Sequence, residues 1–231
     1  NTTATNTSGS ISSQVRANPT YGQSIVSYTG SSSASTVGHG LSSAPELVIT
    51  KRRDGTGNWG VYHTSNGATK YQLLNSTEAV GTTTAMWNDT APTNNVFSIG
   101  TDNDTNGSSK DYIAYCFHSV TGYSKFGSYT GNGSTTGPTV TTGFKPAFVM
   151  IKRTNASGND WIIHDSTRDP SNPNDAYLAA NEANAEGSYT PIDFLDTGFQ
   201  PKTTHAGMND SGSTYIYMAF ADKREYAYWL D

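Results

Sequence analysis

The sequence predicts an all-β protein made of two tandem homologous units. Blocks of sequence recur in the same order, about one hundred residues apart. The block "SYTG" begins at Ser27 and again at Ser128, and "LVITKRR" from Leu47 has its counterpart in "FVMIKRT" from Phe148. These blocks are rich in the aromatic and β-branched residues that strands favour. Strand and helix patterns do not alternate, so a parallel-sheet enzyme fold is not expected.

Short strands separated by polar turns are expected along both copies. They are predicted near residues 24–29, 46–52, 59–63, 71–75, 95–99 and 111–118, and near 125–130, 147–153, 160–164, 176–180, 192–196 and 213–221. Turn chemistry agrees with this assignment, because Asp54-Gly55 and Asn66-Gly67 supply left-handed backbone positions. The segment around Ala179–Glu186 is the one helical hint, and we expect at most a single turn there.

The chain divides into three parts. Residues 1–20 carry almost no large apolar side chains and end in an Asn-Pro break, so they are predicted to be a linker or extended arm. Residues 21–121 and 122–231 are predicted to be β-sandwich repeats of the jelly-roll or lectin-like kind. About one hundred residues suffice for one sandwich each, which we favour, but the spacing also allows two halves of one larger sandwich.

The composition excludes several function classes. The formal charge of −5 argues against a nucleic-acid surface, and charged residues make up only 14% of the chain. No apolar run approaches the ~18 residues that a membrane span needs. The single cysteine, Cys116, excludes an intrachain disulfide. The chain begins with Asn, without initiator Met or signal peptide, which suggests a processed or excised piece of a longer protein.

The full set of blocks, including "VGHGL", "NWGVYH" and "DYIAYCF" in the first copy and "GPTVTTGF" and "YIYMAF" in the second, resembles a known module. It is similar to a duplicated domain found in virion proteins of marine tailed bacteriophages, notably those infecting cyanobacteria. There the domain usually lies toward the C-terminal end of tail-fibre or other appendage proteins. The resemblance implies location on a virus particle and a role in attachment or in capsid and tail decoration. It implies no catalytic residue.

The sequence "DNDTNG" is a candidate cation site. Asp102, Asp104 and Asn106, followed by glycine, match the start of a calcium loop with oxygen ligands at alternate positions. The twelfth position is Ile113, however, where a bidentate Glu would be expected, and no flanking helices are evident. A polar hairpin loop is the alternative. Apart from this possible Ca²⁺, no cofactor is expected.

Histidines and carboxylates give little sign of chemistry. His63 and His164 end the matched blocks "NWGVYH" and "NDWIIH", which favours a structural role for both. No H-x-H or C-x-x-C pattern suggests zinc. No nucleophile motif appears, and many acidic residues fall in turns with Pro and Asn. The chain is therefore not expected to be an enzyme.

Loop aromatics are the candidate ligand-binding residues. Trp87, Asn88 and Asp89 in "MWNDTAPT" combine a ring that can stack on a sugar with groups that hydrogen-bond hydroxyls, and Tyr189 is the rough counterpart in the second copy. The alternative for Trp87 is a side chain folded back over the core. Trp59 and Trp161 recur at matched strand positions, where core packing is expected. Tyr226, Tyr228 and Trp229 are expected to dock on their own domain or on a neighbouring subunit.

Three hypotheses about function follow. The first is a non-enzymatic virion module, part of a tail fibre or similar appendage, that recognises a host-surface glycan or protein. It would act as a homo-oligomer, for example a trimer, together with other virion proteins, without nucleic-acid binding or membrane insertion. The second is a capsid or tail decoration or cement protein with no receptor. The third, which we favour least, is a glycan depolymerase.

Overall fold

The computed structural model describes residues 2–222, which form an all-β protein with 42% strand and 7% helix. This confirms the predicted fold class. The described residues divide into two compact units: unit 1 within Asn1–Leu74 and Val80–Ser119, and unit 2 within Asn75–Ala79 and Val120–Asp231. The aromatic segment with Tyr226, Tyr228 and Trp229 lies outside the described residues. No helix among residues 2–222 is long and apolar enough to span a membrane.

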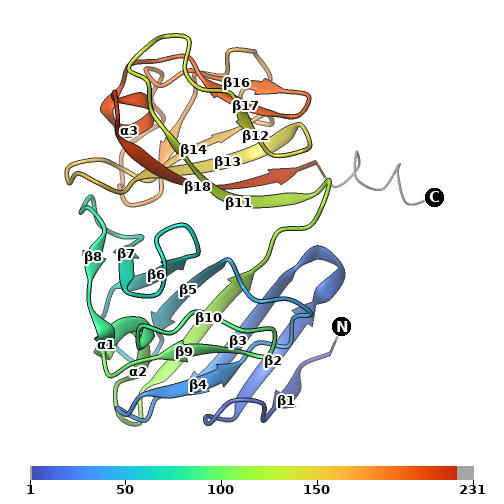
Figure 1. The fold of residues 1–231 in the computed structure, drawn as a ribbon, viewed down its shortest axis with the longest axis vertical. Helices are drawn as coiled ribbons and strands as arrows, with labels where there is room; N and C mark the ends of the chain where they lie inside the picture. The colour runs from blue at the N-terminus through green and yellow to red at the C-terminus, as the bar shows by residue number, and fades with distance from the viewer. Residues whose placement is uncertain (1, 223–231) are drawn as a thin grey trace. The chain divides into compact units, whose positions relative to one another are not determined.

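Unit 1 contains one large and one small antiparallel sheet (Figure 1). The large sheet has eight strands in the order β1 (Ala4–Asn6), β2 (Ser13–Asn18), β3 (Gln23–Thr29), β10 (Asp111–Phe117), β5 (Leu47–Arg52), β6 (Trp59–His63), β7 (Lys70–Leu73) and β8 (Gly81–Thr82). The small sheet pairs β4 (Ser35–Gly38) with β9 (Val96–Ile99). Short helical segments complete the unit: η1 (Pro19–Tyr21), α1 (Thr84–Trp87) and α2 (Asn103–Asn106).

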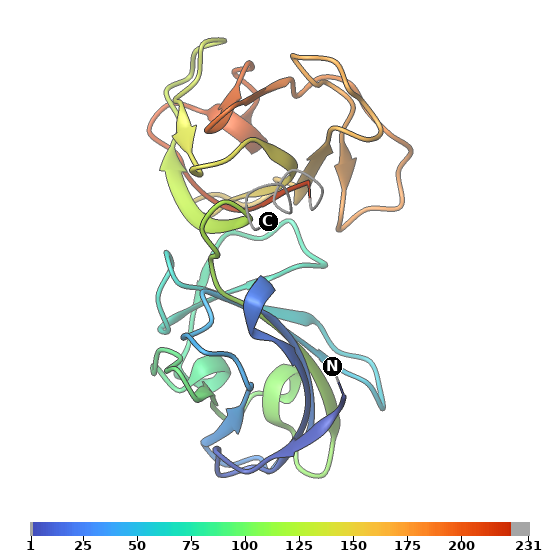
Figure 2. The ribbon, with the colours of Figure 1, turned by 90° about the vertical axis from the view of Figure 1, so that its right-hand side faces the viewer.

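The core of unit 1 contains side chains from both of its sheets. Val37 of β4 and Phe97 of β9 are buried in one cluster with Val26 of β3 and Tyr112 of β10. Burying an apolar side chain of this size stabilises the fold by about 1.5–3 kcal/mol. The helical turns α1 and α2 lie on one face of the curved large sheet (Figure 2), and Trp87 of α1 belongs to the same cluster. Unit 1 is therefore a sandwich of a large and a small sheet.

The prediction of a linker or arm over residues 1–20 is wrong. Strand β2 pairs with β3 from Ser13↔Tyr28 to Asn18↔Gln23, and β1 pairs with β2. The physical reason is that strand pairing satisfies backbone groups and needs few large side chains. Ser13 and Val15 are buried whereas Gln14 is exposed, so the buried face of β2 contains only one large apolar side chain, that of Val15.

Unit 2 repeats the combination of a larger and a smaller antiparallel sheet. The five-stranded sheet has the order β11 (Ser124–Thr130), β18 (Thr214–Ala221), β13 (Pro146–Arg153), β14 (Ile162–Asp165) and β15 (Leu178–Ala179). The three-stranded sheet has the order β12 (Val140–Thr141), β17 (Gly198–Pro201) and β16 (Ile192–Leu195), and α3 (Ala206–Asn209) is one helical turn. The hint of a helix near Ala179–Glu186 gives only a turn, in which the Glu182 N–H donates to the Ala179 carbonyl at 3.2 Å.

A stacked tyrosine pair occurs in each unit at corresponding strands. In unit 1, Tyr28 of β3 stacks on Tyr112 of β10 with ring centroids 5.2 Å apart. In unit 2, Tyr129 of β11 stacks on Tyr215 of β18 at 4.9 Å. The hydroxyl of Tyr28 donates to a carbonyl in α2, at 2.7 Å, and that of Tyr129 to a carbonyl in α3, at 2.6 Å. Both pairs thus tie the large sheet to a helical turn.

A buried asparagine ends each of these helical turns. Asn106 is fully buried, and its amide group donates to Ser33 O at 2.7 Å and to Gly100 O at 2.6 Å. Asn209 is also fully buried and donates to Ser134 O at 2.7 Å and to Thr203 O at 3.0 Å. Each side chain therefore holds two loops of its unit together.

Candidate functional site

The most exposed large aromatic side chain of the described residues is Tyr189 in unit 2. It lies in the loop between β15 and β16, and 54% of its surface is accessible. Leaving a ring exposed on a rigid β scaffold is typical of a binding surface, because loops carry most recognition residues. The structure therefore keeps Tyr189 as a candidate ligand-binding residue.

The ring of the buried residue Tyr177 packs against the ring of Tyr189. The two ring centroids are 4.7 Å apart at an interplanar angle of 71°, an edge-to-face contact. Tyr177 itself is buried, and its backbone exchanges two hydrogen bonds with Gly187, at 2.9 and 3.0 Å. A Cβ atom at position 187 would lie 2.4 Å from the Tyr177 ring, so only glycine fits there. Burial, together with the Tyr189 hydroxyl, raises the pKa of Tyr177, which therefore stays protonated at neutral pH.

His205 also contacts Tyr189, with ring centroids 5.0 Å apart. The side chain also caps α3, because its Nδ1 accepts the Gly207 N–H at 3.1 Å. Nδ1 is thus an acceptor, and a neutral ring carries its proton on Nε2. Burial lowers the pKa of His205, and the nearby Asp160 carboxylate only partly offsets this effect. The ring beside Tyr189 is therefore mainly neutral at pH 7.

Polar groups gather next to these rings. The Asp160 carboxylate acts electrostatically on both His205 and Tyr177. Asn181 donates to Asp160 Oδ1 at 2.8 Å and to Glu182 Oε1 at 3.2 Å, while its own Oδ1 accepts the Trp161 N–H at 2.7 Å. Asp160 thus lies within electrostatic range of the two rings that contact Tyr189, and it is held by Asn181. We call Tyr177, Tyr189, His205 and Asp160 the Tyr189 platform.

The prediction that Trp87 binds ligand is wrong. Trp87 is 2% exposed, lies in the core cluster of unit 1 and meets Tyr62 edge-to-face with centroids 6.0 Å apart. Thr83 starts the helical turn α1 by accepting the Ala85 N–H, and this turn directs Trp87 inward. The alternative of a tryptophan folded over the core therefore describes it.

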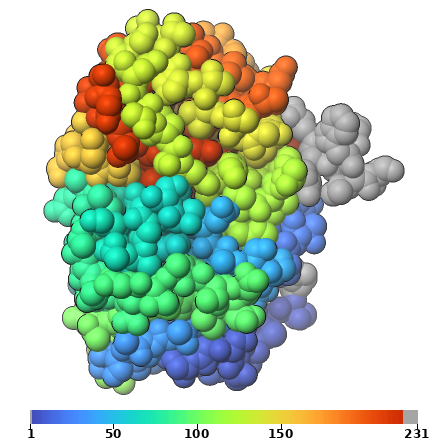
Figure 3. All heavy atoms as spheres, in the orientation of Figure 1, coloured from blue at the N-terminus to red at the C-terminus, as the bar shows by residue number. Residues whose placement is uncertain are grey.

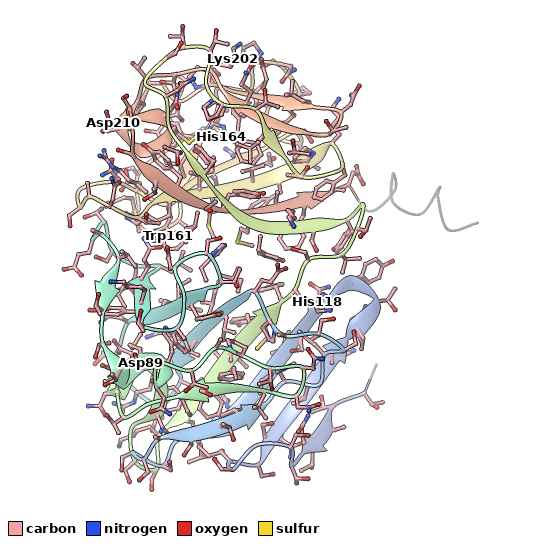
Figure 4. The ribbon with its side chains drawn as sticks, in the orientation of Figure 1. Asp89, His118, Trp161, His164, Lys202 and Asp210 are labelled. Carbon is pink, nitrogen blue, oxygen red and sulfur yellow. The ribbon has the colours of Figure 1, made fainter. Side chains whose placement is uncertain are left out.

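Asn88 and Asp89 follow Trp87 and are both exposed. Their φ angles of 51° and 47° are left-handed, a conformation that Asn and Asp tolerate better than most residues and that ends the helical turn. The segment after α1 lies on the surface of unit 1 (Figure 3), and Figure 4 labels Asp89 there. Because Trp87 is buried, the predicted combination of an exposed tryptophan ring with Asn88 and Asp89 does not form.

The candidate calcium residues are used inside the fold. Asp102 caps α2 by accepting the Asp104 N–H at 2.8 Å, and Asp104 accepts two hydrogen bonds from Asn58, at 2.8 and 2.9 Å. The side-chain oxygen Oδ1 of Asn106 accepts the Ser31 N–H at 2.7 Å. The three side chains thus bond to three different segments of the fold, as the alternative of a polar loop implies. Within residues 2–222, no group of three or more His, Cys, Asp or Glu side chains is placed to hold a metal ion.

The two strand tryptophans differ. Trp161 is 3% exposed, as predicted for a packed residue. Trp59 is only half-buried, and its ring stacks on Tyr115 at 6.4 Å. Tyr115 alternates with the core residues Ala114 and Cys116, so this pair lies on the face of the large sheet opposite the core.

Sequence reasoning missed Tyr177 and His205, the supports of Tyr189. One signal was available for Tyr177: a glycine follows ten residues later, and the same spacing separates Tyr71 from Gly81. In both pairs a Cβ on the glycine would lie 2.4 Å from the tyrosine ring. No comparable pattern marked His205, whose role depends on a contact between two loops.

These features define a class: an all-β protein of two sandwich-like units with an aromatic cluster exposed on one of them. Residues 1–224 match a family model described as a domain of unknown function, DUF7483, and the chain belongs to this family. No curated protein and no solved structure matches it.

Proposed function

We propose that this chain is a non-enzymatic module of a bacteriophage virion, part of a tail fibre or similar appendage, that attaches the particle to a host-surface glycan or protein. Its place is the surface of the extracellular particle, and it acts as a homo-oligomer alongside other virion proteins. The sequence blocks that resemble marine phage appendage domains support the location. The all-β fold, with recognition groups on loops, supports a binding role.

The Tyr189 platform is the observation that carries the proposal. The Tyr189 side chain is 54% exposed, so its ring is available to a partner, and its contacts with Tyr177 and His205 hold it in place. Ordering the ring in advance lowers the entropy lost on binding. Asp160 Oδ1 accepts the Asn181 amide at 2.8 Å, which fixes the carboxylate in one orientation and leaves its Oδ2 to accept hydroxyl groups.

We also propose that the two units arose by duplication. The stacked tyrosines, the buried asparagines that end α2 and α3, and the paired tyrosine and glycine recur in each unit with closely similar distances. The Tyr189 ring, by contrast, belongs to a loop of unit 2. A repeated framework with one divergent loop is what a binding module built by duplication would contain.

The test is binding of the fluorescently labelled chain to a panel of marine cyanobacterial strains, measured by flow cytometry. We expect saturable binding to some strains only. Tyr189→Ala should weaken it about tenfold, as loss of a central aromatic contact does, and Tyr189→Phe should retain it. Lys145→Ala, at an exposed position of unit 2 outside the Tyr189 platform, is the surface control and should bind as the unchanged chain does.

Three results would count against the proposal. Equal binding by Tyr189→Ala and the unchanged chain would remove the platform from attachment. Absence of binding to every strain by a well-folded sample would favour the decoration or cement role. Release of reducing ends from host polysaccharide would show instead that the chain is a depolymerase.

A further inference from the structure

Unit 1 contains a surface hollow. Its lining residues include none of the Tyr189 platform. The hollow measures about 510 Å³, within the roughly 300–1,000 Å³ of small-molecule sites, and it is lined by Arg16, Ala17, Asn18, Gln23, Ser24, Ile25, Tyr115 and Phe117. These residues belong to β2, β3 and β10, three adjacent strands of the large sheet (Figure 1). The hollow therefore lies on a rigid part of the fold.

Strand register places six of these side chains in two neighbouring rows. Arg16, Ile25 and Tyr115 are opposite one another across the three strands, and so are Asn18, Gln23 and Phe117. Their sequence neighbours Val15, Val26 and Cys116 belong to the core, so the two rows lie on the other face. The floor of the hollow thus changes across the sheet from a guanidinium and an amide on β2 to two aromatic rings on β10.

Arg16 gives the hollow a positive charge without a partner. None of the ion pairs among residues 2–222 includes Arg16, and no carboxylate lines the hollow. Strand β1 pairs with β2 only as far as Val15, so Arg16 lies where the sheet edge becomes open. A guanidinium in this setting binds a carboxylate by two parallel hydrogen bonds.

The aromatic side of the hollow is extended by Trp59, which stacks on Tyr115 at 6.4 Å. The amine of Lys51 lies 6.0 Å from the centre of the Trp59 ring and adds a second positive charge on this face. Ile25, with 47% of its surface exposed, completes an apolar strip between Arg16 and Tyr115. A ligand that fits has an apolar face at one end and a negative charge at the other.

We propose that this hollow binds an acidic sugar, a pyranose ring that carries a carboxylate. The carboxylate pairs with Arg16, and the C–H face of the ring lies on Tyr115 and Phe117. The Gln23 amide bonds the hydroxyls, and the Asn18 amide nitrogen donates to them, since Asn18 Oδ1 accepts the Tyr21 N–H at 3.4 Å. The amides favour a sugar over an aromatic carboxylate, which has no hydroxyls to bond. This site does not rest on the proposed attachment function, since it uses different residues, another unit and a soluble ligand.

The experiment is isothermal titration calorimetry of the full chain with trigalacturonate at low ionic strength. Arg16→Gln should weaken binding about tenfold, the effect of losing one charge-assisted contact. Arg53→Gln removes the same charge from an exposed arginine outside the hollow and should bind as the unchanged chain does. The methyl ester of the same trimer keeps the rings but loses the charge, and it should bind at least about tenfold more weakly.

Several results would overturn the assignment. These are no binding of trigalacturonate at millimolar concentration, equal binding by Arg16→Gln and the unchanged chain, or equal binding of the acid and its ester. Benzoate binding as tightly as one galacturonate unit would overturn the choice of a sugar. Tyr189→Ala should leave the titration unchanged, so failure of this site and failure of the Tyr189 platform are distinguishable.

Discussion

His164 should make unit 2 lose stability as the pH falls from 7 toward 4. The side chain is fully buried among the strands of unit 2, where Figure 4 labels it. Its Nδ1 lies 2.8 Å from Asn174 Oδ1, and its Nε2 lies 3.3 Å from the Thr190 hydroxyl. The Asn174 amide nitrogen donates to two backbone carbonyls, so Asn174 Oδ1 must accept a proton from His164 Nδ1. The fold thus holds a neutral imidazole.

The size of the effect follows from the pKa. Burial lowers the pKa of His164 from 6.5 to about 4, although the bond to Asn174 opposes this shift. The unfolded chain therefore binds more protons than the folded chain between these two values, and folding stability falls as the pH drops through this window. One unit of pKa corresponds to about 1.4 kcal/mol, so unit 2 should lose about 2 kcal/mol between pH 7 and pH 4.5. Above pH 6.5 the contribution of the neutral ring is fully present.

Urea unfolding followed by ¹⁹F NMR of fluorotryptophan isolates unit 2, because Trp161 is buried there. His164→Asn keeps a donor toward Asn174 and cannot be protonated, so its stability should be nearly flat between pH 7 and 4.5. His205→Asn preserves the cap of α3 and should retain most of the slope. Carboxylates with lowered pKa, such as Asp165, lose their contribution only below this window. The same slope in His164→Asn and the unchanged chain would refute the reasoning.

Three further predictions concern stability. Trp87→Ala should cost unit 1 about 3–5 kcal/mol, the cost of emptying a core site. Trp87→Phe should cost less because Phe fills most of the site, and it removes a buried indole N–H that has no partner among residues 2–222. Urea unfolding of both variants measures this, and equal losses would contradict it. Asn106→Ala and Asn209→Ala should each cost about 2–4 kcal/mol in their own units, since each leaves a buried carbonyl and a second, partly buried carbonyl without this donor. Hydrogen exchange locates the loss, and an effect in one variant alone would argue against equivalent roles. Added Ca²⁺ or EDTA should leave the unfolding temperature unchanged because Asp104 is already bonded to Asn58; a rise with Ca²⁺ in scanning calorimetry would restore the cation site.

The central strands could be predicted because each carries its own pattern. Strands β3, β5 and β10, and β11, β13 and β18 in unit 2, alternate buried and exposed side chains or form short apolar runs, and each lies within about two residues of its predicted range. The strands that were missed, among them β2, β4 and β17, have few large apolar residues. Their positions are set by neighbours that are distant in the sequence, and a local pattern does not contain that information.

Strand register also corrects the predicted equivalence of His63 and His164. Leu47 and Phe148 begin matched blocks, but His63 pairs with Leu47 whereas His164 pairs with Val149, the residue after Phe148. A shift of one residue places a side chain on the opposite face of its strand. His164 therefore faces the core of unit 2, and His63 faces away from the core of unit 1. Matching letters could not reveal this difference, because it depends on pairing.

The predicted site residues of unit 1 also show that a local sequence pattern does not reveal how a residue is used in the fold. Trp87 and the Asp102–Asn106 segment look functional in sequence because tryptophan and alternating oxygens are common in binding sites, yet both complete the fold. Features that both units share, such as the stacked tyrosines, are accounted for by folding alone. The Tyr189 platform of unit 2 and the Arg16 row of unit 1 are surface features built from residues outside these shared contacts. Stability does not require an exposed ring or an unpaired guanidinium at either place, and the two binding proposals therefore rest on these residues.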